Sequence, residues 1–181
     1  MDDGADSPLA ARMQHWRMTR SSPGHAALRH GRVSIPGQIY LLTFTTFERT
    51  PHFRDFWTAQ AAVTGLLHSP ARCDAAIWCW VLMPDHVHVL LQLPNDRPRS
   101  LDALVRNMKS VATRNVRRCI TLQQPLWQRA FHDRALRRDE DLRATARYII
   151  ANPLRAGLVR HIGDYPFWGA AWLNDARPEP L

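Results

Sequence analysis

The segment AAIWCWVLMPDHVHVLLQL, residues 75–93, decides the fold class of this chain. Its first half, Ala75–Leu82, is a nearly continuous apolar run, which is typical of a buried strand. Pro84 and Asp85 favour a turn, and apolar residues resume at once in His86–Leu93. The segment therefore predicts two antiparallel strands that are joined by a tight turn.

Further elements are predicted on both sides of this hairpin. Before it, the β-branched and aromatic run Gln38–Phe47 predicts a first strand, and apolar residues at helical spacing predict a helix over residues 55–68. After it, Leu101–Val116 has one apolar face and Ser100 precedes it as an N-cap, which predicts a long helix.

The last third of the chain contains more helix. Residues 126–138 have the pattern of a strand or an irregular segment, and a third helix is expected from about Asp139 to Ala151 or Asn152. Pro153 ends that helix because proline disfavours helical geometry at the preceding residue. A short helix is predicted around Leu154–Val159. This order of elements predicts an α+β fold in which helices cover an antiparallel sheet.

We divide the chain into an N-terminal arm, one domain and a tail. Residues 1–36 mix Asp, Ser, Pro, Gly and Arg without periodicity and are interpreted as a flexible or loosely packed arm. Residues 37–175 form the domain, and residues 176–181 form the tail. No apolar run approaches the ~18 residues that span a bilayer, and the N-terminus lacks the pattern of a signal peptide. We therefore expect a cytoplasmic protein without a membrane partner.

The chain is strongly basic, and its charge is unevenly placed. Its 181 residues contain 24 basic and 16 acidic side chains, which gives a formal net charge of +8. Residues 97–160 alone contain 15 basic and five acidic residues, a local excess of ten. Clustered arginine is typical of proteins that bind polyanions, most simply nucleic acid. A solvated arginine-rich surface is the alternative that charge alone leaves open.

Two histidines in the second predicted strand are candidate metal ligands. His86 and His88 are two residues apart, so on a strand both imidazoles point to one face while Val87 points to the other. Two such imidazoles can hold one divalent cation through ring nitrogens. A pair of hydrogen-bonded histidines without a metal is the structural alternative. In contrast, Cys73, Cys79 and Cys119 form no CxxC pair and do not predict a zinc site.

A second candidate site lies near the end of the third predicted helix. Tyr148 and Asn152 are four residues apart, so they lie on one face of the helix, beside its apolar stripe. A phenol and an amide oxygen presented together offer a nucleophile and a metal ligand. The structural alternative is a tyrosine at the edge of the core and an asparagine that closes the helix.

These segments resemble one protein family. The sequences WVLMPDHVHVLL (residues 80–91) and YIIANPLRAGLV (residues 148–159) resemble the HUH single-tyrosine transposases. The sequences LWQRAFHD, LRRDEDL and DYPFW, which begin at Leu126, Leu136 and Asp164, resemble its branch of REP-associated tyrosine transposases. The resemblance runs from about Gly31 to Trp172 in the family's order.

The resemblance implies a fold, an activity and a set of site residues. It implies a ferredoxin-like sheet with the HUH motif on a central strand. It also implies cleavage and rejoining of single-stranded DNA beside a short hairpin of the REP type, with Mg²⁺ or Mn²⁺ as cofactor and a 5′-phosphotyrosine intermediate. His86 and His88 match the metal ligands, Tyr148 matches the nucleophile, and Asn152 matches a further metal ligand. The resemblance to this branch implies a monomer, and the dimers of the wider family leave a dimer open as the alternative.

DNA contacts are expected from basic side chains. Arg106, Lys109, Arg114 and Arg117 share the polar side of the helix over Leu101–Val116, and Arg155 lies in the Tyr148 segment. Two other functions remain open: a hairpin-binding protein derived from a transposase that no longer cuts DNA, and a metal-dependent nuclease that uses water with Tyr148 as a structural residue.

Overall fold

The protein is described here by a computed structural model that covers residues 34–71, 75–96, 100–137 and 141–173. Almost all of the predicted arm, the whole of the predicted tail and Cys73 lie outside these ranges.

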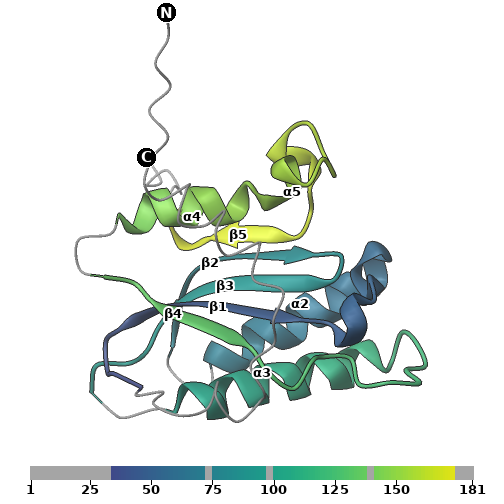
Figure 1. The fold of residues 1–181 in the computed structure, drawn as a ribbon, viewed down its shortest axis with the longest axis horizontal. Helices are drawn as coiled ribbons and strands as arrows, with labels where there is room; N and C mark the ends of the chain where they lie inside the picture. Colours follow the sequence, from purple (N-terminus) through teal and green to yellow (C-terminus); the bar gives the residue numbers. More distant parts are fainter. Residues whose placement is uncertain (1–33, 72–74, 97–99, 138–140, 174–181) are drawn as a thin grey trace, which may run out of the picture. The chain divides into compact units, whose positions relative to one another are not determined.

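The described residues form a five-stranded sheet in the order β4-β1-β3-β2-β5 (Figure 1). All four strand pairings are antiparallel, so the predicted α+β fold is confirmed. In chain order the elements are β1 Ile39–Thr45, η1 Phe47–Arg49, η2 His52–Arg54, α2 Phe56–Ala71, β2 Ala76–Met83, β3 His86–Gln92, α3 Leu101–Val116, β4 His132–Ala135, α4 Leu142–Ile150, α5 Asn152–Arg155, η3 Ile162–Asp164, β5 Trp168–Ala170 and η4 Ala171–Leu173.

One face of the sheet packs against α2 and α3, which lie side by side in Figure 1. The strand residues that point to this face belong to the same buried core as the apolar residues of the two helices. Phe44 from β1, Leu82 from β2 and Val87 from β3 are each at most 1% exposed. Ser100 accepts a hydrogen bond from Ala103 N and caps α3, as the sequence predicts.

The other face of the sheet carries α4 and α5. Val81 and Leu90 alternate with the residues of the first core and point to this second face, where they are fully buried. Both α4 and α5 contact β2, and α4 also contacts β5 (Figure 1). The two faces are therefore covered by different helices, and the side chains of each strand alternate between them.

In the last third of the chain, one predicted helix has the wrong bounds and one strand was not predicted. The short helix predicted around Leu154–Val159 is α5, which begins earlier, at Asn152, and ends at Arg155. Pro153 occupies the first turn of α5, where its missing N–H needs no partner, so it starts a helix as well as ending one. Gly157 adopts φ +68 and prevents continuation of the helix. The edge strand β5 was not predicted, because three residues contain too little periodicity to identify it.

Among the described residues, no helix has the length and apolar character needed to cross a membrane.

Candidate active site

The two histidines of β3 lie on the α4 side of the sheet. β3 is the middle strand of five, and Val87 between the histidines points into the α2–α3 core, so His86 and His88 point to the second face. Their ring centroids are 4.9 Å apart and the rings meet edge to face at 84°. His88 is buried, with 8% of its surface exposed.

Each imidazole is oriented by a hydrogen bond at Nδ1. Asp85 Oδ1 lies 2.5 Å from Nδ1 of His86, and Thr43 Oγ1 lies 2.8 Å from Nδ1 of His88. Thr43 reaches His88 because the two residues are directly opposite each other in the β1–β3 pairing. Arg49 Nη1 also bonds the other carboxylate oxygen of Asp85 at 3.2 Å. These contacts make Nε2 of each ring the nitrogen that would bind a metal.

The electrostatics of the site favour a neutral His88 and an ionised Asp85. Burial, as the largest cause, and the nearby positive charges of His86, Arg155 and Arg49 together lower the pKa of His88 to about 3, although the charge of Asp85 opposes the shift. The hydrogen bond from His86 is the largest cause of the lowered pKa of Asp85, and the charges of His86 and Arg49 add to it. A neutral imidazole is the form that binds metals, so His88 needs no proton removed near neutral pH.

The two histidine nitrogens fit a divalent cation that takes oxygen atoms as its further ligands. In the described ranges, no three His, Cys, Asp or Glu side chains come together as a metal site. His86 and His88 supply two nitrogen ligands whose Nδ1 atoms are already satisfied, an arrangement that is common around protein-bound metals. A hard cation such as Mg²⁺ would then require oxygen ligands from an amide, water or a substrate phosphate.

Tyr148, near the end of α4, is held by Arg155. The Arg155 guanidinium lies 3.8 Å from the centroid of the Tyr148 ring, which is cation–π stacking. Nη1 of the same group donates to the Tyr148 carbonyl oxygen at 2.7 Å. The tyrosine is half-buried, and the stacking fixes the ring plane in which its hydroxyl lies.

Asn152 is bound within the same turn of the chain. Its Nδ2 donates to Ile149 O at 2.6 Å, and its Oδ1 accepts from Nη2 of Arg155 at 2.8 Å. Asn152 therefore links the end of α4 to the start of α5. These contacts are consistent with the structural alternative that the sequence left open, and the role of Asn152 as a metal ligand stays a prediction.

The α4–α5 turn and the two histidines share one face of the sheet. Both helices contact β2, whose Val81 is directly opposite His88 in the β2–β3 pairing. The positive charge of Arg155 is close enough to lower the pKa of His88. The structure thus brings together the HUH strand and the Tyr148 segment, which are about 60 residues apart in the sequence.

The basic residues of α3 lie elsewhere. α3 covers the face opposite to His86 and His88, so its cations are separated from Tyr148 by the sheet. Arg106, Arg114 and Arg117 are exposed. In contrast, Nζ of Lys109 donates to the backbone oxygens of Gln128 at 2.8 Å and Ala130 at 2.9 Å. Lys109 thus has a structural task in holding the segment before β4, and a DNA contact through it stays a prediction.

Four residues near the site had no role in the sequence analysis, and the first of them is Arg49, the partner of Asp85. Asp85 was interpreted only as a turn residue, although it directly precedes the HxH pattern. Thr43 is one of several threonines in a strand, and only the strand register identifies it as the partner of His88. His132 is directly opposite Thr43 in the β1–β4 pairing, so it continues the same row across the sheet. For Thr43 and His132 no local sequence signal exists.

Comparisons with known proteins identify the family and several relatives. The family described as "Transposase IS200 like" matches residues 36–152. A Haemophilus influenzae protein that is provisionally named a REP-associated tyrosine transposase is 32% identical over 108 residues, which cover 54% of this chain and 59% of the relative. The REP-associated tyrosine transposase of Escherichia coli K12 is 28% identical over 88 residues, covering 49% and 50%. The alignments thus span between half and three fifths of the curated relatives.

The fold is also that of a solved structure. A REP-associated tyrosine transposase bound to a REP hairpin superposes with a TM-score of 0.66, and the match covers 77% of this chain and 81% of the other. The two sequences are 24% identical, so this likeness concerns the fold. Together with the curated relatives it confirms the resemblance that the sequence motifs indicated.

Proposed function

Because this chain belongs to the IS200-like transposase family, we propose that it cuts and rejoins single-stranded DNA beside a hairpin, with Tyr148 as the nucleophile. The observation that carries this proposal is the meeting of two distant segments on one face of the sheet. Arg155 stacks on Tyr148 at 3.8 Å, and its charge lowers the pKa of His88, one of the two proposed metal ligands of β3. The proposal requires the phenol, the two imidazoles and the guanidinium to act on one phosphate group.

Tyr148 can act as a nucleophile only if the negative charge of the reaction is stabilised. A free phenol has a pKa of about 10, so near neutral pH Tyr148 is a poor nucleophile unless charge is stabilised around the phosphate. Attack by its oxygen on phosphorus forms an O–P bond and breaks the bond to the 3′ oxygen, leaving a 5′-phosphotyrosine and a 3′-hydroxyl. The proton that the phenol loses is balanced by the proton that the leaving oxygen gains. The phosphodiester energy is retained, so rejoining needs no ATP.

A divalent cation is part of the proposal. His86, His88 and Asn152 would hold Mg²⁺ or Mn²⁺, which supplies positive charge that polarises the scissile phosphate. Asp85 and Thr43 orient the two imidazoles through Nδ1. Because Oδ1 of Asn152 accepts from Arg155 in this structure, use of that oxygen as a ligand requires the Arg155 contact to open or to be shared.

Arg155 has two tasks in this proposal. Its stacking and its bond to the Tyr148 carbonyl hold the nucleophile, and its charge stabilises the negative phosphate during attack. An arginine suits both tasks because its planar fork stacks on a ring and donates several hydrogen bonds at once.

The proposed partner is DNA of the REP-hairpin type. The curated relatives are named after REP elements, and the solved relative is bound to a REP hairpin. The local excess of ten basic charges between residues 97 and 160 supports an anionic partner. We propose that the protein acts as a monomer, as the resemblance implies.

Substitution Tyr148→Phe tests the proposed function. It removes one oxygen and keeps the ring on which Arg155 stacks, so folding and hairpin binding should remain nearly unchanged. Purified protein is incubated with a labelled hairpin oligonucleotide and Mn²⁺, and adducts are resolved on a denaturing gel. Wild type should form a denaturant-resistant adduct and the Phe variant should form none. An adduct in the Phe variant excludes Tyr148 as the nucleophile. Hydrolysis without adduct by wild type indicates a water-using nuclease, and a shifted band alone indicates a binding protein.

A further inference from the structure

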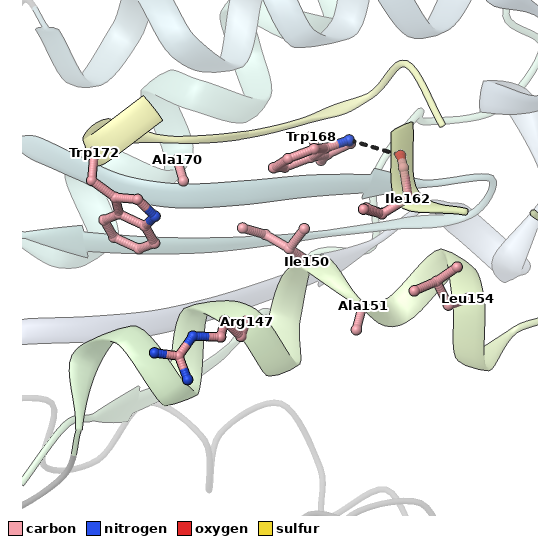
Figure 2. Close-up of a pocket in the computed structure, with 8 residues that line it drawn as sticks. All are labelled: Arg147, Ile150, Ala151, Leu154, Ile162, Trp168, Ala170 and Trp172. Carbon is pink, nitrogen blue, oxygen red and sulfur yellow. Dashed lines mark hydrogen bonds between the residues drawn. The ribbon is translucent and has the colours of Figure 1, made fainter. Parts of the chain in front are cut away.

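A groove of about 280 Å³ lies between the α4–α5 segment and strand β5 (Figure 2). Ile150 from α4 is central among its lining residues. Figure 2 shows Arg147 and Trp172 at one end of the groove and Trp168 and Leu154 at the other. None of the functions assigned above uses this groove.

The lining of the groove combines flat apolar surfaces with one cation. Trp168 donates its indole N–H to Ile162 O at 3.1 Å, so the polar edge of this ring is already satisfied. Arg147 is exposed and is the one charged side chain among the eight that line the groove; none of the eight is acidic. Indole surfaces beside a guanidinium fit an aromatic group that carries a negative charge.

The groove lies beside the candidate active site. Trp168 is directly opposite Val81 in the β5–β2 pairing, and Val81 is directly opposite His88 in the β2–β3 pairing. Trp168 therefore lies on the same face as His88, two strands or about 10 Å away. Arg147 precedes Tyr148, so α4 presents the groove cation and the proposed nucleophile about 100° apart around its axis.

We propose that this groove binds one unpaired nucleobase of the DNA strand that Tyr148 attacks, with Arg147 on the adjacent phosphate. The proposal rests on the proposed function and adds the position of a nucleotide next to the cleaved bond. Its volume suits one base, and stacking on tryptophan is tolerant of base identity. The charge of Arg147 and the absence of acidic lining residues favour an anionic nucleotide over an uncharged apolar ligand.

An abasic-site scan combined with Trp172→Ala tests the proposal. A labelled REP-type DNA hairpin with single-stranded flanks is prepared with one base removed at each flank position in turn. At one position, removal of the base should weaken binding to wild type about tenfold. We assign the stacking to Trp172, because it lies at the same end of the groove as Arg147. Trp172→Ala should therefore bind the intact strand and the strand that is abasic at that position with nearly equal affinity, because the indole on which the base stacks is gone.

Matched variants separate the groove from general effects. Arg143→Gln removes an exposed charge on the same helix outside the groove, and Trp57→Ala removes a 70% exposed indole on α2, on the far face of the sheet. Both should keep the wild-type abasic profile. If Trp172→Ala has a lowered melting temperature, Leu154→Glu replaces it, because Leu154 is 36% exposed and a carboxylate there repels the strand. Arg147→Gln should weaken binding to every strand that occupies the groove.

The outcomes distinguish this proposal from the proposed function. If wild type forms the Tyr148 adduct but Trp172→Ala keeps the same abasic sensitivity as wild type, the groove proposal is wrong and the transposase activity stands. A flat abasic profile of wild type also overturns it. A change in sedimentation of Trp172→Ala, without a change in DNA binding, would assign the groove to a second copy of the chain. If wild type neither binds the strand nor forms an adduct, both proposals fall.

Discussion

Asn152 illustrates how one side chain can have both a structural and a chemical task. Its amide satisfies Ile149 O and holds one nitrogen of Arg155, whose other nitrogen holds the Tyr148 carbonyl. The same amide oxygen is the proposed third metal ligand. Loss of the structural link would lower the stability of the protein. Loss of the metal ligand would raise the metal concentration that the reaction requires.

Asn152→Ala therefore has a two-part expected result. The melting temperature should fall by a few degrees, because a hydrogen-bonded link worth about 1 kcal/mol is lost between α4 and α5. The Mn²⁺ concentration needed for half-maximal adduct should rise, with partial rescue at excess Mn²⁺. Thermal unfolding and a Mn²⁺ titration of adduct formation measure the two parts. An unchanged metal requirement would leave Asn152 as a structural residue of the α4–α5 junction.

His88 makes the stability of the protein depend on pH. Its folded-state pKa of about 3 lies below the unfolded value of about 6.5, so below pH 6.5 the unfolded chain takes up a proton that native His88 does not. The contribution is fully present above pH 6.5 and is lost as the pH falls towards 3. Between pH 7 and pH 5 the loss amounts to about 2 kcal/mol of unfolding free energy.

His88→Asn isolates this effect, because an amide can keep a hydrogen bond to Thr43 but does not titrate. Urea unfolding of metal-free wild type and variant is compared at pH 7 and pH 5. Wild type should lose about 2 kcal/mol more than the variant over this interval. Equal losses in both proteins would show that His88 is not the group responsible.

Among the elements, the contact of α2 with α3 depends on a glycine. A Cβ atom at Gly65 would lie 2.6 Å from the Cα and N atoms of Ala112, which are backbone atoms that cannot rotate away. The two helices pack closely at this point, and Ala112 is fully buried. The two helices together cover the sheet face to which Val87 points. Because neighbouring side chains on a strand alternate, His86 and His88 point to the opposite face.

Gly65→Ala should destabilise the protein by about 1–3 kcal/mol. Alanine favours a helix over glycine by about 1 kcal/mol, but the helices must separate to admit the methyl group, and that cost is larger. Gly163→Ala is the matched control, because a Cβ there would meet no atom within 4 Å. Chemical denaturation measures both variants. A Gly65→Ala protein as stable as wild type would show that the α2–α3 contact readily yields.

At the scale of the whole molecule, basic charge is present on both faces of the sheet. Arg106 and Arg114 are on α3 and Arg117 is its C-cap, whereas Arg147 and Arg155 accompany the site on the opposite face. DNA that reaches Tyr148 meets the second set directly. A contact with the first set requires the strand or its hairpin to extend around the edge of the domain.

The salt dependence of hairpin binding measures these contributions. Binding should weaken steeply with salt, with a slope of roughly 0.7 per neutralised phosphate on a single strand. Replacing Arg106, Arg114 and Arg117 together by Gln should lower the slope by about 2, without changing the rate of adduct formation at saturating DNA. An unchanged slope would identify these three arginines as a solvated surface, and a flat dependence in wild type would contradict a phosphate-dominated interface.

The sequence by itself determined the local features of this protein. Alternation along a strand required His86 and His88 to share a face, and the apolar stripe of Leu101–Val116 with Ser100 before it defined α3 from cap to end. Such features follow from the periodicity and capping of consecutive residues, which a single segment contains in full. The motif segments also determined the family, because they combine several residue types at fixed spacing.

Only the tertiary structure decided which distant residues meet. Strand register selected Thr43 as the partner of His88, and the turn into α5 placed Arg155 on Tyr148. β5 places Trp168 at the edge of the sheet beside α4. Nζ of Lys109 donates to backbone oxygens instead of pointing to solvent. Each of these contacts depends on how separate segments pack, and the free energy of that packing is distributed over the whole core. No local sequence pattern therefore predicts these contacts.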